Sequence, residues 1–201
     1  MEFGIEPNEP VSAGAVVIAT VASPGPAATL AAEPWSRGSL LAGVARRLSS
    51  LDAVVVVVRD ENELSLVDGV PDVTVIIDQE WEEGVSSPLR VGLDWLTHAT
   101  EVAAAFVINM NIPEVEPAVL DELAAAHANS ETPVSVPKYR YARAGPVLLD
   151  RSIWPRFLSA EGDVDVEHFL LAHPQWVTEV RVDFAPPRRI VDSDDLLELA
   201  T

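Results

Sequence analysis

The sequence contains no cysteine and only one lysine, Lys138. The absence of cysteine excludes disulfide bonds, thiolate metal ligands and cysteine nucleophiles. Arginines make up the other fixed positive charges, against 32 aspartates and glutamates, so the formal net charge is −19. An electrostatic field of this sign repels the phosphates of nucleic acids. We therefore expect no nucleic-acid partner.

Long apolar runs are also missing. A membrane-spanning helix needs about 18–20 consecutive apolar residues, and no run in the sequence approaches that length. The first residues, MEFGIEPNEP, lack the basic segment followed by an apolar run that marks a secretory signal. We expect a cytoplasmic, soluble protein with no membrane partner.

The length of 201 residues suits one α/β domain with a sizeable core. Residues 1–12 hold Pro7 and Pro10 among acidic residues, which predicts a disordered lead-in. No shift in composition divides the remainder, so residues 13–201 are predicted to form a single domain.

Apolar runs alternate with helical patterns along this domain, and their periods separate strands from helices. The expected strands cover 15–20, 53–58, 73–77, 103–108, 133–136, 145–150 and 177–182. The expected helices cover 39–51, 87–97, 116–128, 152–158, 164–172 and 192–200, and Ser39 is a candidate N-cap of the first. This alternation predicts a three-layer, Rossmann-like α/β fold. Its sheet should be mostly parallel, with one or two late antiparallel strands, and 177–182 should be an edge or antiparallel strand.

The segment 78–113 is the best candidate for a site. It reads as a strand end, a loop rich in Gly and Ser, an amphipathic helix, and a buried strand that stops at Asn109 and Asn111. In an open parallel sheet, ligands bind at the carboxyl ends of the strands, so both Asn side chains are candidates to line a site. The alternative is that they only cap the strand before the turn at Pro113.

Short motifs in this and later segments follow one another in a recognisable order. A first series reads Asp78, Trp81, Gly84, Ser86, Ser87, Gly92 and Leu93, and a second reads Met110, Asn111, Ile112 and Pro113. Later ones read Pro137, Tyr139, Gly145, Pro146, Val147, Arg151, Trp154, Pro155, Gly162, Asp163, His173, Pro174, Asp192, Ser193, Asp195 and Leu196. In order and spacing the chain resembles the MobA-like NTP transferases, closest to the molybdenum-cofactor cytidylyltransferase (MocA-like) branch.

This resemblance implies the fold of the nucleotide-diphospho-sugar transferases. It also implies transfer of a nucleotidyl group from an NTP to a phosphorylated, molybdopterin-type acceptor, with Mg²⁺ bridging the phosphates. The positions that it assigns to nucleotide binding are Ala19, Thr20, Val21, Ser23, Asp78, Gly84, Ser86 and Asn109. Those that it assigns to the metal are Asn111 and Asp192.

Candidate contacts to an anionic acceptor are Arg90, Lys138 and Arg140. Lys138 and Arg140 belong to the densest positive segment of an acidic chain. The alternative interpretation is that this segment is only a solvated hairpin. Arg90 alternatively pairs with a nearby acid such as Asp94, four residues away. The four histidines lack metal-ligand spacing and are expected to be structural or exposed, and no Ser-His-Asp arrangement can be placed.

The reactive parts depart from the family pattern. The family follows its first strand with a glycine-rich loop that carries Arg and Lys, whereas residues 19–36 contain no Arg or Lys and include Pro24 and Pro26, which lack the N–H groups that hold phosphate. Asn111 also replaces the family's metal-binding Asp. An arginine at 37, 46 or 47 that folded back over the first strand would restore positive charge.

Two alternatives to an active transferase follow from these departures. The first is a catalytically inactive pseudoenzyme that serves as a binding module with a protein partner or as a homo-oligomer. The second is a site for another small ligand, such as a sugar phosphate, in the same crevice.

Overall fold

The computed structural model describes residues 11–18, 34–67, 69–70, 72–81, 86–112, 114–160, 162 and 165–188. Most of the expected lead-in and the expected helix at 192–200 lie outside these residues, as does the segment 19–33. Within the described ranges, no helix is both long and apolar enough to cross a membrane.

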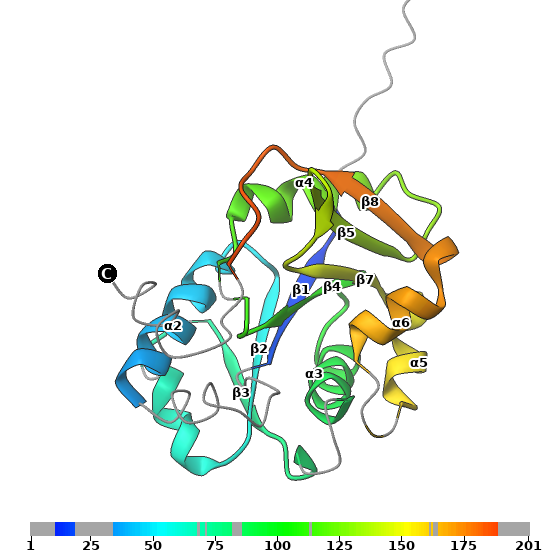
Figure 1. Ribbon diagram of the computed structural model, residues 1–201. Helices are drawn as coiled ribbons and strands as arrows, with labels where there is room; N and C mark the ends of the chain where they lie inside the picture. The colour runs from blue at the N-terminus through cyan, green and yellow to red at the C-terminus, as the bar shows by residue number, and fades with distance from the viewer. Residues whose placement is uncertain are drawn as a thin grey trace, which may run out of the picture.

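A mixed sheet forms the middle layer of the molecule (Figure 1). In the described residues its order is β3-β2-β1-β4-β7-β5-β6, and β8 pairs with β5. The strands are β1 (Ala13–Ile18), β2 (Ala53–Val58), β3 (Thr74–Ile77), β4 (Ala104–Asn109), β5 (Val134–Tyr139), β6 (Ala142–Arg143), β7 (Val147–Asp150) and β8 (Val177–Arg181).

Strands β1 to β4 are mutually parallel, and β7 runs antiparallel to both β4 and β5. Strand β6 is antiparallel to β5, and β8 is parallel to it. The predicted mostly parallel sheet with late antiparallel strands is therefore confirmed. The segment predicted as an edge or antiparallel strand is β8, which lies parallel to its neighbour.

Helices cover both faces of the sheet. They are α2 (Pro34–Arg47), α3 (Ser86–Ala99), α4 (Pro117–His127), α5 (Trp154–Leu158) and α6 (Val166–Ala172), with 3-10 turns η1 (Glu61–Val67), η3 (Arg151–Ile153) and η4 (Pro174–Trp176). The prediction that Ser39 caps α2 is wrong, because the helix already begins at Pro34. Proline is favoured in a first helical turn, where its missing N–H has no partner to lose.

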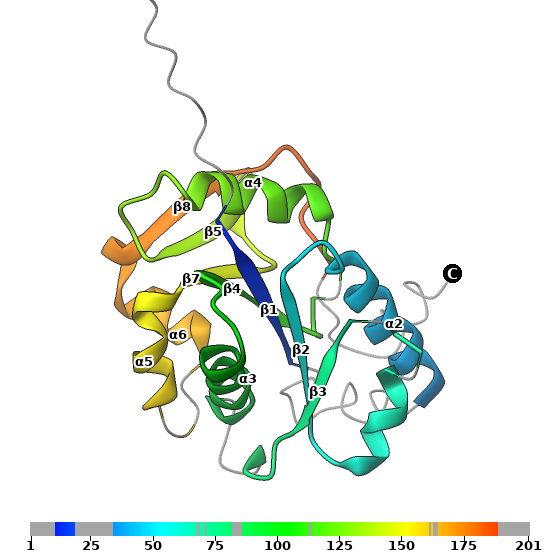
Figure 2. The ribbon, with the colours of Figure 1, turned by 180° about the vertical axis from the view of Figure 1, so that it is seen from behind.

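Helices lie on either side of the sheet (Figures 1 and 2), and an apolar core lies beneath them on each face. One is covered by α2 and α4 and contains Phe106, and the other is covered by α3, α5 and α6 and contains Trp154. Side chains of a strand alternate between faces, so the valines of β2 contribute to both cores. This explains why β2 is an unbroken β-branched run, as a strand buried on both faces requires.

The chain order of the strands creates a switch point between β1 and β4. From β1 the chain proceeds to β2 and β3 on one side, and it then returns to β4 on the other side of β1. Ile18 at the end of β1 is paired with Asn109 at the end of β4, and the N–H of Met110 donates to the carbonyl of Ile18 at 3.2 Å. In open α/β sheets, a crevice outside such carboxyl ends is the usual ligand site.

Candidate functional site

Asp78 lies at the carboxyl end of β3 and is 1% exposed. Its N–H donates to the carbonyl of Val58 at 2.8 Å, which extends the β2–β3 pairing. Its Oδ1 accepts hydrogen bonds from Ser87 Oγ and from the N–H of Glu80, both at 2.9 Å. Within the described residues, its buried Oδ2 has no hydrogen-bond partner. A buried acceptor without a partner is costly, so this oxygen is a candidate to accept a hydrogen bond from a group outside the described residues.

Asn111 follows β4 and carries a second buried acceptor, Oδ1, that likewise has no partner in the described part of the chain. The side chain of Asn109 is used differently, because its Oδ1 accepts from the N–H of Asn111 at 3.2 Å. The carbonyl of Asn109 also accepts from the N–H of Ile112, at 2.9 Å. Asn109 thus caps the turn through its side-chain and backbone oxygens, whereas the amide oxygen of Asn111 remains available.

Among the described residues, these two oxygens are the only buried side-chain nitrogen or oxygen atoms without a hydrogen-bond partner. Both lie at the carboxyl edge of the sheet. Strands β2 and β1 separate the strands that carry them. Three strand spacings of about 4.8 Å place β3 and β4 about 14 Å apart. One metal ion cannot contact both side chains, whereas an elongated ligand lying across the end of β1 can reach both.

The first turn of α3 is tied to the rest of the site by its hydroxyls. Ser86, which is 2% exposed, donates its Oγ–H to the carbonyl of Gly162 at 2.8 Å, so its hydroxyl is already used. Ser87 donates to Asp78 and was not among the predicted site residues. Nothing in the local sequence distinguished Ser87 from Ser86, because only the helix phase decides which one faces Asp78.

Arg90 lies one turn into α3 and connects two loops. Its Nη2 is 2.5 Å from Glu80 Oε2, and its Nη1 donates to the carbonyl of Ala160 at 3.3 Å. The expected pairing with a nearby acid is thus made by Glu80, while Asp94 lies 3.5 Å from His98 instead. Glu80 was missed because it approaches Arg90 through the loop, outside helical spacing.

Lys138 and Arg140 lie at the carboxyl end of β5. Lys138 Nζ forms a hydrogen bond and an ion pair with Glu179, whose other oxygen lies 2.6 Å from Arg143 Nε. The hydrogen bonds from Lys138 and Arg143 hold the pKa of the Glu179 carboxyl below its ordinary value. Arg140 is exposed in the β5–β6 turn at a φ of 48°. The structure therefore places Lys138 in a cluster where two cations share one carboxylate, and it leaves Arg140 at the surface.

Several predicted residues lie outside the described residues, namely Ala19, Thr20, Val21, Ser23, Gly84 and Asp192. Arg46 and Arg47 are described, and both are exposed at the end of α2. The chain from there leads to Asp52, whose N–H donates to the carbonyl of Ala13 at 3.0 Å, at the amino edge of the sheet. The Nη1 of Arg47 nevertheless donates to the carbonyl of Val115 at 3.3 Å, so this guanidinium lies against the segment that joins β4 to α4.

Metal-binding side chains do not cluster in the described part of the chain. No group of three or more His, Cys, Asp or Glu residues is arranged to hold a metal ion in the described part of the chain. Asn111 Oδ1 is a hard oxygen donor without a partner, and oxygen donors are what Mg²⁺ and Mn²⁺ favour. A cation at this position fits one protein ligand from the described residues. Asp165, in contrast, caps α6 by accepting from the N–H of His168 at 2.8 Å.

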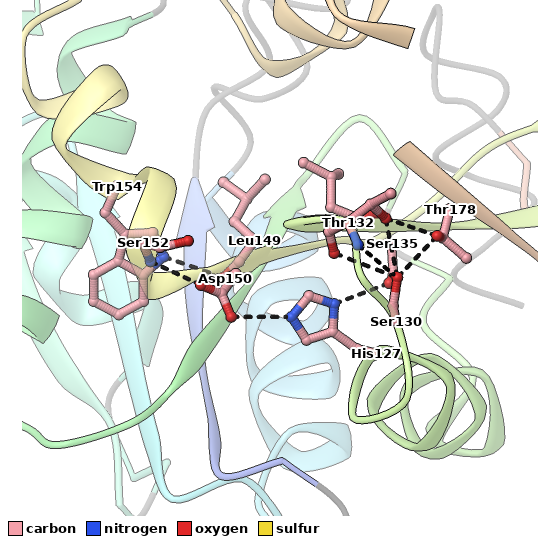
Figure 3. A network of polar contacts seen from close by, with 10 residues as sticks. His127, Ser130, Thr132, Ser135, Leu149, Asp150, Ser152, Trp154 and Thr178 are labelled. Atoms are coloured by element: carbon pink, nitrogen blue, oxygen red, sulfur yellow. Dashed lines mark hydrogen bonds and ion pairs between the residues drawn. The ribbon is translucent and has the colours of Figure 1, made fainter. Parts of the chain in front are cut away.

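A second polar cluster lies at the opposite, amino edge of the sheet (Figure 3). His127 Nδ1 is 3.0 Å from Ser135 Oγ, and its Nε2 is 3.5 Å from Asp150 Oδ2. The residues are those of a hydrolytic triad, but Ser135 is 0% exposed and no substrate can reach its hydroxyl. The cluster is structural, which confirms the expectation for His127.

Comparison with known proteins identifies the family. The model of the MobA-like NTP transferase domain matches residues 31–177, a range that begins after most of the segment following β1. No curated protein matches the chain.

Solved structures share the fold across nearly the whole chain. Rv0371c from Mycobacterium tuberculosis H37Rv is 19% identical, with a TM-score of 0.67 and coverage of 94% of this chain and 97% of that one. A structure of the same protein in complex with manganese has a TM-score of 0.65 at 19% identity and the same coverage.

Two synthases show a similar likeness. The 4-diphosphocytidyl-2C-methyl-D-erythritol synthase of Anaerococcus prevotii DSM 20548 is 11% identical, with a TM-score of 0.66 and coverage of 92% of this chain and 93% of that one. CMP:2-keto-3-deoxy-manno-octonic acid synthetase complexed with CTP is 13% identical, with a TM-score of 0.64 and coverage of 94% and 96%. These likenesses establish the fold, and the family match covers most of the chain. The chain therefore belongs to the MobA-like NTP transferase family.

Proposed function

We propose that this protein binds a nucleoside triphosphate along the carboxyl edge of its sheet and transfers the nucleotidyl group to a phosphorylated acceptor. The observation that supports this most strongly is the location of the two unpartnered buried oxygens, on Asp78 and Asn111. Both lie at the edge where this class of sheet binds ligands, on either side of the β1 end. A ligand that donates to Asp78 and carries a phosphate-bound cation to Asn111 satisfies both.

The nucleoside end of the ligand belongs at Asp78. A carboxylate oxygen accepts hydrogen bonds, so we assign a ligand N–H or O–H group to Asp78 Oδ2. The exocyclic amino group of a base and the hydroxyls of ribose are such donors. Because Oδ1 is fixed by Ser87 and Glu80, the free oxygen has one direction, which gives the contact specificity.

The phosphate end belongs near Asn111, where a divalent cation fits the free amide oxygen. Asp192 is the second ligand implied by the family pattern. When bound, such an ion neutralises the charge of the triphosphate and fixes its position. The manganese complex of the related Rv0371c supports a divalent metal in this fold. A neutral amide binds a cation more weakly than a carboxylate, so the phosphates themselves must contribute ligands.

The acceptor belongs on the side of the switch point where Lys138 and Arg140 lie. In the transfer, an oxygen of the acceptor forms a bond to the α-phosphorus while the α–β phosphoanhydride bond breaks and pyrophosphate leaves. An anionic acceptor competes with Glu179 for Lys138, so binding must open that ion pair. Arg90 is held by Glu80 and by Ala160, which suits a role in positioning the loops around the nucleotide.

The contacts of the basic side chains favour a second candidate, a nucleotide-binding module without turnover. Lys138 and Arg143 share the carboxylate of Glu179, Arg90 pairs with Glu80, and Arg47 donates to the carbonyl of Val115. Catalysis of phosphoryl transfer depends on positive charge near the phosphates. Loss of that charge lowers turnover more than it lowers binding.

Titration of the protein with CTP, GTP, ATP and UTP, each with and without Mg²⁺, tests the proposal by melting temperature and calorimetry. A ligand at 100 times its Kd adds about 2.7 kcal/mol of stability. We expect one nucleotide to stabilise the protein, and Asp78→Asn to abolish the effect. Asp121→Asn, at an exposed position on α4, is the matched control. No stabilisation by any nucleotide at millimolar concentration contradicts the proposal.

Release of pyrophosphate then separates the two candidates. Nucleotide binding accompanied by pyrophosphate release in the presence of a phosphorylated acceptor supports the transferase. Binding of the same nucleotide with no release across a panel of sugar-phosphate and pterin-phosphate acceptors supports the binding module.

A further inference from the structure

Strand β8 is an edge of the sheet. In the described residues it pairs with β5 alone, through the register Val134↔Val177 to Lys138↔Arg181. The strand lies along the outer side of the molecule, beyond β5 (Figures 1 and 2). An edge strand presents a row of backbone N–H and C=O groups that a further strand can use.

The hydrogen-bond pattern shows which residues form that row. The N–H of Val182 donates to the carbonyl of Lys138 at 3.3 Å, and Lys138 is the register partner of Arg181. In a parallel ladder, a residue bonds to the two neighbours of its register partner, so the even-numbered residues of β8 face β5. The backbones of Val177, Glu179 and Arg181 therefore face outward.

The side chains of the outward-facing residues carry opposite charges. Residues in register share a face of the sheet, so Glu179 and Arg181 project on the face that holds Val134 and Val136. Glu179 is partly exposed, at 29% of its side chain, and Arg181 is exposed. The outer edge of β8 thus presents an acid and a base two residues apart on one face.

We propose that β8 pairs antiparallel with β8 of a second copy of this chain, about a two-fold axis at Val180. Antiparallel ladders need outward-facing residues opposite one another, so the axis must pass through a residue of β8 and not between two. An axis at Glu179 or at Arg181 places like charges opposite each other. An axis at Val180 places Glu179 of each copy opposite Arg181 of its partner, and symmetry repeats this pair.

The charge distribution of the whole chain favours the same surface. Each copy carries a net charge of −19, so most approaches between copies are repulsive. At β8, Lys138 and Arg143 both pair with Glu179, and the exposed Arg181 follows before the exposed Asp183, which gives three cations against two acids. This cationic corner is a place where an acidic chain can approach another with reduced repulsion. Cross-strand pairs of opposite charge then fix the register.

The test is the molar mass of the full-length protein in solution, measured by sedimentation equilibrium. We expect a dimer, and Arg181→Glu to weaken it by at least about ten-fold because like charges then face each other twice. Arg46→Glu makes the same change in net charge on α2, at the far side of the sheet, and is expected to leave the dimer intact. A wild-type protein that stays monomeric at high micromolar concentration overturns the proposal, as does equal weakening by both variants.

A charge swap provides a second, independent readout. Glu179→Arg alone is expected to be monomeric, because arginine would face Arg181 of the partner. A mixture of Glu179→Arg with Arg181→Glu restores complementary pairs at both positions and is expected to form the heterodimer. Circular dichroism checks that each variant is folded. If Glu179→Arg does not fold, because Lys138 and Arg143 lose their partner, then Arg181→Glu against its control decides the outcome.

Discussion

His127 Nε2 lies 3.5 Å from Asp150 Oδ2, and this contact joins the last residue of α4 to the last residue of β7. Through Nδ1 the same ring reaches Ser135 on β5. His127 is 6% exposed and Ser135 is 0% exposed, so the ring is a buried polar link between a helix and two antiparallel strands. Removing it leaves a hydroxyl without its partner in a site that water cannot easily enter.

We predict that His127→Ala lowers the free energy of unfolding by about 2–4 kcal/mol, from the lost hydrogen bonds and the cavity together. Urea unfolding measures this change. His98→Ala is the control, since His98 is exposed on α3 and surface substitutions change stability by about 0.5 kcal/mol or less. Equal effects of the two substitutions would show that the buried link does not stabilise the fold.

The contact between Asp150 and His127 affects how the free energy of unfolding changes at low pH. Burial raises the pKa of Asp150, but hydrogen bonds from Ser152 and the contact with His127 outweigh burial, so the pKa lies below the ordinary value of 3.8. A lowered pKa in the folded state means that the carboxylate stabilises the fold above pH 3.8. That stabilisation is lost as the pH falls through the folded-state pKa.

The expected result for Asp150→Asn is a stability deficit that is full near neutral pH and shrinks toward the most acidic conditions. Urea unfolding of both proteins across the acid range measures the deficit at each pH. Asp121→Asn, on the exposed face of α4, should leave the two curves parallel. A deficit that does not change with pH would mean that the charge of Asp150 makes no contribution.

We predict that replacing Gly92 and Gly43 by alanine changes the stability of the protein in opposite directions. A Cβ at Gly92 would overlap Cγ1 of Val16, because α3 packs directly on β1, whereas nothing lies within 4 Å of a Cβ at Gly43 on α2. Gly92→Ala should therefore destabilise the protein by about 1–3 kcal/mol through overpacking. Gly43→Ala should stabilise it by about 0.5–1 kcal/mol, since alanine is the better helix former. Thermal unfolding compares them, and changes of the same sign would contradict the packing of α3.

We predict that lysine cannot replace Arg151 without a loss of stability. Its guanidinium donates to the carbonyls of Thr97, Thr100 and Val102, at 2.7, 3.0 and 2.9 Å, and so holds the end of α3. A lysine ammonium cannot span the three acceptors in this fork geometry. We expect Arg151→Lys to cost about 1–3 kcal/mol in urea unfolding. The exposed Arg46→Lys should cost nothing measurable, and a similar cost for both would rule out the fork.

The features that the sequence predicted well are those with a local signal. Strand β2 matched its predicted range of 53–58 because five consecutive valines have no other stable environment than a strand buried on both faces. The order of motifs predicted the family, which the match over residues 31–177 confirms. The beginning of α2 was predicted at Ser39, a candidate N-cap, whereas the helix begins at Pro34.

The site is harder to predict because its contacts join distant segments. Nothing near Asp78 in the sequence shows that one oxygen is satisfied by Ser87 and the other is not. Likewise, His127, Ser135 and Asp150 meet only because β7 turns back between β4 and β5. Lys138 was predicted from the density of positive charge, but its ion pair with Glu179 depends on the pairing of β8 with β5.

Asn111 tests whether the family's metal chemistry can be restored at the carboxyl edge. Asn111→Asp replaces a neutral, unpartnered amide oxygen with a carboxylate, which is the stronger ligand for a divalent cation. Without metal, the new buried charge in a chain of net charge −19 should lower the melting temperature. With Mn²⁺, the carboxylate gains a partner, so the melting temperature should recover and the affinity for Mn²⁺, measured by calorimetry, should rise by about ten-fold or more. Gln175→Glu, at an exposed position in η4, adds the same charge without a site and should show neither effect. If Mn²⁺ stabilises both variants equally, the oxygen of Asn111 does not face a cation site.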